Sequence, residues 1–186
     1  MKKLIIGFLM ASLSAVALAD NVIIEGSNVQ GVNGSKDGKG FLMKYTKTLN
    51  SNLEGDVQYQ TTQTDGTNAM STRLEAGLTP SYNVGPVKLY TRAVAGEKYV
   101  TTGSGHFSYY SFEPGFIAPL GGNFSARIGW RYRNAFDSTA NADETRTWRA
   151  GVKYDFNKQD AVNLRYDRSR GDQNQNIWAL SYIRSF

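Results

Sequence analysis

The sequence predicts an all-β fold, a transmembrane up-and-down antiparallel β-barrel of about ten strands, within a range of eight to twelve. Three observations lead to this prediction. Apolar and polar residues alternate along most of the chain, short turns alternate with longer polar loops, and the last segment ends in Phe186. The mean hydropathy of −0.43 agrees with a barrel, because such strands direct about half of their side chains to a polar interior.

Residues 1–19 are expected to be a secretory signal peptide. Lys2 and Lys3 precede an apolar run that ends near Leu18, and Ala17 and Ala19 form a small-residue cleavage site. The run is shorter than the roughly 20 apolar residues of a membrane-spanning helix. We therefore expect an exported bacterial protein whose residues 20–186 form one barrel domain. With no cysteine, no disulfide can stabilise it.

The segment from Phe124 to Arg133 shows the alternation most clearly. Rings and aliphatic side chains occupy one face, while Arg127, Arg131 and Arg133 occupy the other. A shift of one residue would exchange the two faces, so the register of this strand is strongly specified. The same pattern recurs at residues 53–60, 70–79, 148–156 and 162–167.

Turns and loops predict the order of the strands. Short turns are expected at residues 50–51, 83–86, 120–122 and 157–159, and longer loops at 33–39, 63–68, 100–105, 137–144 and 171–173. This regular alternation of short turns and longer loops predicts an up-and-down meander with both chain ends on the periplasmic side. Eight strands would result if the first hairpin or the segment containing Pro114 and Pro119 were not part of the barrel.

Alternation alone does not decide which face lies inside, because soluble β-sandwiches alternate too. The signal peptide and the aromatic residues near segment ends favour lipid on the outside, since amphipathic rings prefer the membrane interface. Residues 178–186 resemble the C-terminal strand that outer-membrane barrels present to their assembly machinery, although Arg184 departs from that pattern. The resemblance implies a location in the outer membrane of a Gram-negative cell, with the assembly machinery and membrane lipid as partners.

The inward face is rich in cations, and two interpretations of it stay open. A barrel of about ten strands is close to the size that side chains fill, which favours a packed network of ion pairs. A narrow anion path is the alternative, because guanidinium groups bind carboxylates bidentately. The residues expected to line such a path and bind anions are Arg92, Arg127, Arg131, Arg133, Arg149, Lys153 and Arg165.

Phe112-Glu113-Pro114-Gly115-Phe116, the later Arg131-Tyr132-Arg133 and the final strand ending in Phe resemble the oligogalacturonate-specific porin family. The likeness covers mainly residues 107–186. It implies a monomeric barrel that passes acidic oligosaccharides along an arginine-lined interior. It also implies that Arg131 and Arg133 contact the carboxylates of the substrate.

The sequence thus predicts porin-like passage of anionic solutes such as acidic oligosaccharides. The alternative is a closed structural or adhesion barrel with a salt-bridged interior, whose loop 137–144 meets an extracellular partner. A lipid-modifying enzyme is a minor alternative that rests on His106 and Ser108, two residues apart on one strand face. No enzyme is expected, because the sequence assigns no acidic partner to that pair. No cofactor, no metal and no nucleic acid are expected either, with no cysteine, one histidine and mixed charges.

Overall fold

The computed structural model describes residues 20–101, 105–139 and 143–186. The expected signal peptide, residues 1–19, lies outside the described residues, as does part of the loop 137–144. The described chain forms ten strands, which confirms the predicted number: β1 (Asn21–Gly31), β2 (Gly38–Asn50), β3 (Leu53–Thr64), β4 (Met70–Val84), β5 (Val87–Val100), β6 (His106–Gly121), β7 (Phe124–Ala135), β8 (Thr145–Asp155), β9 (Asp160–Gly171) and β10 (Gln175–Ser185).

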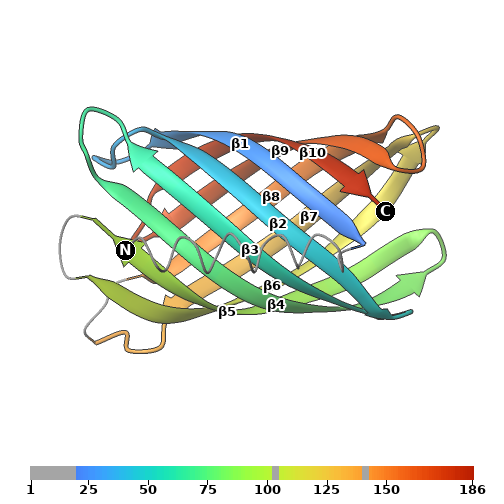
Figure 1. Ribbon diagram of the computed structural model, residues 1–186, viewed down its shortest axis with the longest axis horizontal. Helices are drawn as coiled ribbons and strands as arrows, with labels where there is room; N and C mark the ends of the chain where they lie inside the picture. The colour runs from blue at the N-terminus through green and yellow to red at the C-terminus, as the bar shows by residue number, and fades with distance from the viewer. Residues whose placement is uncertain (1–19, 102–104, 140–142) are drawn as a thin grey trace.

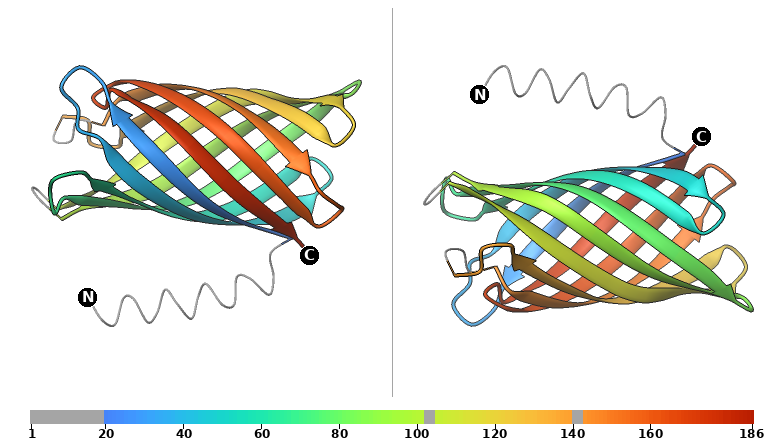
Figure 2. Two further views of the ribbon diagram at one scale, coloured as in Figure 1. Left: turned by 90° about the horizontal axis from the view of Figure 1, so that it is seen from above. Right: turned by 90° about the horizontal axis from the view of Figure 1, so that it is seen from below.

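Each strand pairs antiparallel with its neighbours in sequence, and β1 pairs with β10 to close the barrel. This last pairing runs from Asn21 opposite Ser185 to Gly31 opposite Gln175. Figure 1 shows the strands crossing the barrel at an oblique tilt, and the left view of Figure 2 shows β1 beside β10. Closure leaves no unpaired sheet edge. The predicted up-and-down antiparallel barrel is therefore confirmed.

The two ends of the barrel differ in their connections. One end, which we call the turn end, carries the short connections 51–52, 85–86, 122–123 and 156–159, together with the start of β1 and the end of β10. The other, the loop end, carries the connections 32–37, 65–69, 101–105, 136–144 and 172–174. In outer-membrane barrels the short turns face the periplasm and the longer loops face the exterior. β6 runs unbroken through Pro114 and Pro119.

The predicted sidedness is also confirmed. Outward side chains such as Trp148 and Leu180 are 62% and 60% exposed, whereas the inward Arg133 and Glu113 are 2% and 1% exposed. A barrel that presents large apolar side chains outward and encloses most of the charged side chains of its strands has the polarity of a membrane-spanning barrel. Across residues 20–101, 105–139 and 143–186, no helix has the length and apolarity needed to cross a membrane.

Outward aromatic residues gather toward both ends of the barrel. Toward the turn end, Phe124 and Tyr154 lie with ring centroids 4.7 Å apart, and toward the loop end Tyr166 and Trp178 lie 4.8 Å apart. Aromatic rings in these two positions match the girdles that flank the apolar band of outer-membrane barrels. The rings therefore mark two levels between which the barrel surface meets hydrocarbon.

Candidate functional site: a cationic lumen

The lumen carries more positive than negative side chains. Because successive residues of a strand point to opposite faces, every second residue of the ten strands enters the lumen. Among the described strand residues and Asp143, eleven lysines and arginines face inward against eight carboxylates. The cations are Lys44, Arg73, Lys88, Arg92, Lys98, Arg127, Arg131, Arg133, Arg149, Lys153 and Arg165; the anions are Glu25, Glu54, Asp56, Glu75, Glu113, Asp143, Asp155 and Asp167.

One part of the central lumen is held by Arg92 of β5. Its guanidinium donates to Asp56 of β3 at 2.6 Å and to Glu75 of β4 at 3.1 Å. Tyr109 of β6 donates its hydroxyl proton to the other oxygen of Glu75 at 2.7 Å. A β-carbon at Gly77 would lie 2.8 Å from Asp56 Oδ2, so the glycine leaves room for this carboxylate. Arg92 therefore links three neighbouring strands across their inner face.

A second group in the same layer is built on Arg149 of β8. Arg149 donates to Glu113 of β6 at 2.7 Å and to Asp167 of β9 at 2.9 Å. Arg165 of β9 extends this group by an ion pair with Glu25 of β1 at 2.8 Å. Arg127 of β7 belongs to it through an ion pair with Glu113 at 3.1 Å. Carboxylates shared between two guanidinium groups keep their hydrogen-bond capacity filled.

At the loop end, Asp143 turns into the lumen and is fully buried. Its carboxylate accepts from Lys98 at 2.8 Å, from Arg133 at 2.7 Å and from the side-chain amide of Gln173 at 3.1 Å. Burial acts to raise the pKa of Asp143, but the charges of Arg133, Arg73 and Lys98 outweigh burial and hold that pKa below its usual value. Asp143 belongs to the loop 137–144, so this part of the loop binds the barrel's own cations.

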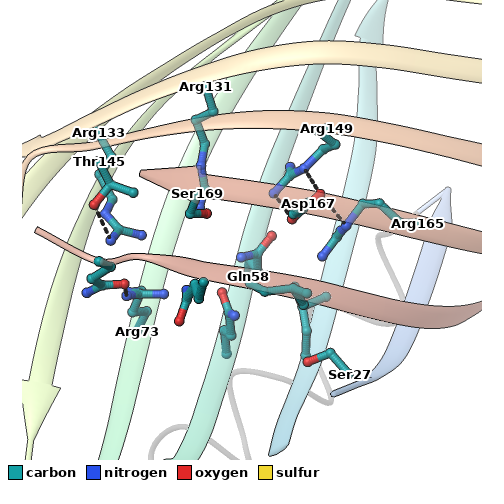
Figure 3. A pocket seen from close by; sticks show the side chains of 15 residues that line it. Ser27, Gln58, Arg73, Arg131, Arg133, Thr145, Arg149, Arg165, Asp167 and Ser169 are labelled. Carbon is teal, nitrogen blue, oxygen red and sulfur yellow. Dashed lines mark hydrogen bonds and ion pairs between the residues drawn. The ribbon is translucent and has the colours of Figure 1, made fainter. Parts of the chain in front are cut away.

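Two inward guanidinium groups form none of the ion pairs found in the described chain. Arg131 has no carboxylate within ion-pair distance, and its Nε is buried without a hydrogen-bond acceptor. Arg73 donates to Gln173 at 3.2 Å, and its Nε is likewise buried without an acceptor. Figure 3 shows Arg131 reaching into the lumen between Arg133 and Arg149, with no interaction drawn to it. Neither side chain is therefore neutralised by a direct ion pair within the described chain.

Two of the cavities formed by described residues lie along the lumen. The larger, of about 230 Å³, lies toward the turn end and is lined by six cations and one carboxylate: Lys44, Arg92, Arg127, Arg149, Lys153, Arg165 and Glu25. The smaller, of about 30 Å³, lies toward the loop end and is lined by Arg73, Arg131, Arg133, Arg149, Arg165 and Asp167. The smaller cavity has room for about one or two water molecules. Of these two cavities, the one toward the turn end is therefore the roomier.

All seven residues predicted to bind anions face this lumen. Six of them form ion pairs within the barrel, Lys153 with Asp155 at 2.9 Å among them, and Arg131 is the exception. The prediction did not include Arg73, Lys98 or Asp143. Lys98 could have been found, because it continues the inward alternation of Arg92 along β5. Asp143 lies outside any strand, and no periodic pattern marks it.

His106 and Ser108 lie on the outer face of β6 near the loop end, as their spacing predicts. The Ser108 hydroxyl donates to Glu97 of β5, and the His106 ring stacks on Tyr99 with centroids 5.5 Å apart. The acidic neighbour therefore contacts the serine and not the imidazole, which differs from the arrangement of a hydrolytic triad. Within the part of the chain that the structure describes, no cluster of acidic residues and histidine could hold a metal ion.

No protein-family model and no curated protein matches the chain. Solved structures do match. The NanC porin is 9% identical with a TM-score of 0.52, covering 89% of this chain and 99% of that one. Neisserial surface protein A is 12% identical with a TM-score of 0.48, covering 89% and 95%. The anion-selective porin from Comamonas acidovorans is 16% identical with a TM-score of 0.42, covering 84% and 52%. The chain has the fold of an outer-membrane β-barrel, and with its apolar exterior it is a protein of the outer membrane.

Proposed function

We propose that the protein is a narrow channel through which small anionic solutes, carboxylates in particular, cross the outer membrane. The observation that carries the proposal is the pair Arg73 and Arg131, two lumen-facing guanidinium groups that form none of the described ion pairs. They line the smaller of the two cavities, toward the loop end, where a solute that crosses the barrel would pass close to them.

The charge balance of the lumen favours this function over a purely structural interior. A buried charge is costly unless it is paired, so a network that only holds strands together gains nothing from surplus cations. Here the surplus lies beside both cavities. Anions entering from solvent would compensate it, and cations would be repelled by it.

The sizes of the two cavities set the class of solute. About 230 Å³ at the turn end accommodates an anion of the size of a single sugar acid, whereas about 30 Å³ at the loop end accommodates water alone. A sugar acid therefore passes only if Arg131 and its neighbours change rotamer. Passage of acidic oligosaccharides remains part of this proposal. It is supported by the resemblance of residues 107–186 to the oligogalacturonate-specific porins and by the fold shared with the NanC porin.

A closed structural barrel is the second candidate, and one observation favours it. Asp143 joins Lys98 of β5, Arg133 of β7 and Gln173 of the last loop, and together these residues span the lumen at the loop end. If this contact is permanent, no solute passes. The arginines below it would then serve only to hold the barrel together.

Planar-bilayer recordings distinguish the two candidates. We expect the purified protein to conduct, with chloride more permeant than potassium and with a further preference for small carboxylates. Arg131→Gln should lower the anion preference a few-fold. A unit charge roughly 8 Å from a passing ion contributes about 2 kcal/mol at an effective dielectric constant of about 20, before neighbouring charges screen it. Arg131→Lys should restore the preference because it restores the charge.

Lys158→Gln is the matched control, since Lys158 is an exposed cation of a turn and lies outside the lumen. This variant should behave as the unmodified protein. If neither the unmodified protein nor Asp143→Asn shows single-channel conductance, the channel proposal is wrong and the closed barrel is supported. If conductance is present but Arg131→Gln leaves its selectivity unchanged, the role proposed for Arg131 is wrong.

A further inference from the structure

Three arginines stand on the outer face of the barrel near the loop end, outside the lumen. They are Arg146 of β8 and Arg168 and Arg170 of β9. Their positions in the strands alternate with the buried inward residues Thr147, Asp167 and Ser169, so their side chains leave the barrel. This outward arginine patch plays no part in the channel proposed above.

The strand register brings the three arginines together. Arg146 lies directly opposite Arg170, and Trp148 lies directly opposite Arg168. Like charges directly opposite each other on neighbouring strands destabilise a sheet. Elsewhere in the described strands, Lys39 of β2 is the other outward cation in the loop-end half. The positive charge of this surface is therefore concentrated on β8 and β9.

Contacts within the chain neutralise only part of this charge. Arg146 forms an ion pair with Glu144 at 2.6 Å, with both side chains largely exposed. Arg170 donates to the backbone carbonyl of its neighbour Ser169 at 2.6 Å. Arg168 is exposed and takes part in none of the hydrogen bonds or ion pairs of the described residues. The patch thus retains two guanidinium groups without a carboxylate partner.

The aromatic residues beside the patch place it at a defined depth in the membrane. On β7, Tyr132 lies opposite Arg146, and Trp130 lies opposite Trp148. Each cross-strand row of the patch therefore has an aromatic side chain as its neighbour on β7. Tyr166 and Trp178 contact each other in the next row toward the turn end, with their rings tilted at 46°. Rings of this kind lie at the level of the lipid headgroups. Guanidinium groups just beyond them, on the loop side, face the headgroups of the outer leaflet.

We propose that Arg146, Arg168 and Arg170 form a binding site for the phosphate groups of an anionic glycolipid in the outer leaflet. Guanidinium groups bind phosphate bidentately, and three of them on two adjacent strands can contact two phosphates of one headgroup. The acyl chains of that lipid would lie along the apolar surface below, which begins at Trp148 and Trp178. Bound phosphate also removes the repulsion between Arg146 and Arg170.

Thermal unfolding in detergent tests this site. The probe is lipid A carrying both phosphates, added to the full-length protein. Because a ligand that binds only the folded state stabilises it, the unfolding temperature should rise with lipid concentration and yield an apparent affinity. In the triple variant Arg146→Gln, Arg168→Gln, Arg170→Gln, that affinity should fall about tenfold or more, since a loss of 1.4 kcal/mol already corresponds to tenfold.

Lys39→Gln is the matched control, because it removes an outward cation at the same end but outside the patch; it should bind as the unmodified protein does. Lipid A without phosphates, and inorganic phosphate at equal concentration, should leave the unfolding temperature unchanged. A shift of equal size with either probe overturns the proposal, as does unchanged affinity in the triple variant. If the triple variant does not fold, Arg168→Gln alone gives the same test, since it breaks none of the described contacts.

Discussion

Among single residues, Arg131 and Arg149 show how different two inward arginines can be. Both lie on the face opposite the lipid-facing rings, on the neighbouring strands β7 and β8. Arg149 is neutralised by Glu113 and Asp167, whereas Arg131 forms no ion pair with the carboxylates of the described residues. Removing Arg149 would leave two buried carboxylates short of a partner, while removing Arg131 breaks no ion pair. This difference makes Arg131 the better residue with which to test transport.

Asp143 gives a prediction about pH. Its pKa in the folded protein lies below the value of about 3.9 expected in the unfolded chain. A lowered folded pKa stabilises the folded state at pH values above the unfolded pKa, and this contribution is lost as the pH falls through the folded pKa. We therefore expect Asp143→Asn to lower the free energy of unfolding by about 3–5 kcal/mol at neutral pH, the range for breaking one side of a buried pair.

Urea unfolding in detergent from pH 6.5 to pH 3, compared between the unmodified protein and Asp143→Asn, measures this contribution. The difference between the two proteins should stay constant down to about pH 4 and shrink below it. A difference that disappears already near pH 6 would contradict the ion pairs of Asp143 with Lys98 and Arg133.

At the level of single elements, glycines of β6 and β7 allow a tyrosine of β5 to pack closely against both strands. The Tyr90 side chain of β5 lies across Gly115 of β6 and Gly129 of β7, and Arg127 stacks over its ring at 4.2 Å. A β-carbon at Gly129 would lie 2.7 Å from the Tyr90 hydroxyl oxygen. These glycines therefore make room for the Tyr90 ring. The Tyr90 hydroxyl accepts a hydrogen bond from Arg127 at 2.7 Å, so the tyrosine also helps to position an arginine of the lumen.

Gly115→Ala should lower the free energy of unfolding by about 1–3 kcal/mol, the usual cost of overpacking. The new methyl group would lie 2.5 Å from the backbone carbonyl oxygen of Ile128 and would also meet Tyr90, and a backbone atom cannot move aside as a side chain can. Urea unfolding in detergent measures the effect. Gly26→Ala is the control, because no atom lies within 4 Å of a β-carbon at that position; equal stability of the two variants would contradict the close packing of Tyr90.

For the whole molecule, the proposed selectivity arises from the sum of the inward charges. Eleven cations against eight carboxylates give the described lumen an excess of three positive charges. Salt screens such a field: the Debye length is about 10 Å at 0.1 M and about 3 Å at 1 M. The wide cavity at the turn end should be screened more effectively than the narrow cavity at the loop end.

Reversal potentials measured at 0.1 M and at 1 M potassium chloride should therefore show a chloride preference that decreases several-fold at the higher concentration. Arg127→Gln, at the wide cavity, should lower the preference mainly at low salt. Arg131→Gln should lower it at both concentrations. A preference independent of salt in the unmodified protein would mean that surplus lumen charge does not control selectivity.

Much of this architecture could be predicted from the sequence, because alternation is a local property. The alternation from Phe124 to Arg133 already shows which residues face inward. The alternation of short turns and longer loops along the chain predicts ten strands, which is the number observed. The segment with Pro114 and Pro119 is one of two that could reduce the predicted number of strands to eight, because proline cannot donate a hydrogen bond to the sheet. The structure keeps both prolines within one strand, whose pairing with β7 is interrupted after Phe112 and resumes at Gly115 in the same register.

The pairing of charges inside the lumen could not be predicted in the same way. Whether Arg131 or Arg149 finds a carboxylate depends on the tilt of the strands and on side chains from strands far apart in sequence, such as Glu25 and Arg165. Asp143 enters the lumen from a connection without regular structure, and alternation says nothing about such residues. Sequence therefore identifies the lining of the lumen, and only the three-dimensional arrangement distinguishes paired from unpaired cations.

The junction of β1 with β10 also governs how the protein can fold. Residues as distant as Asn21 and Ser185 are direct neighbours, so the cylinder cannot be completed while the last segment is still being synthesised or exported. Contacts between such remote parts of a chain form slowly, because the intervening polypeptide must first lose much of its conformational freedom. Until β1 and β10 have paired and the barrel has entered the membrane, its apolar lipid-facing side chains have no hydrocarbon around them. The nascent polypeptide must therefore be protected from aggregation during its passage to the membrane.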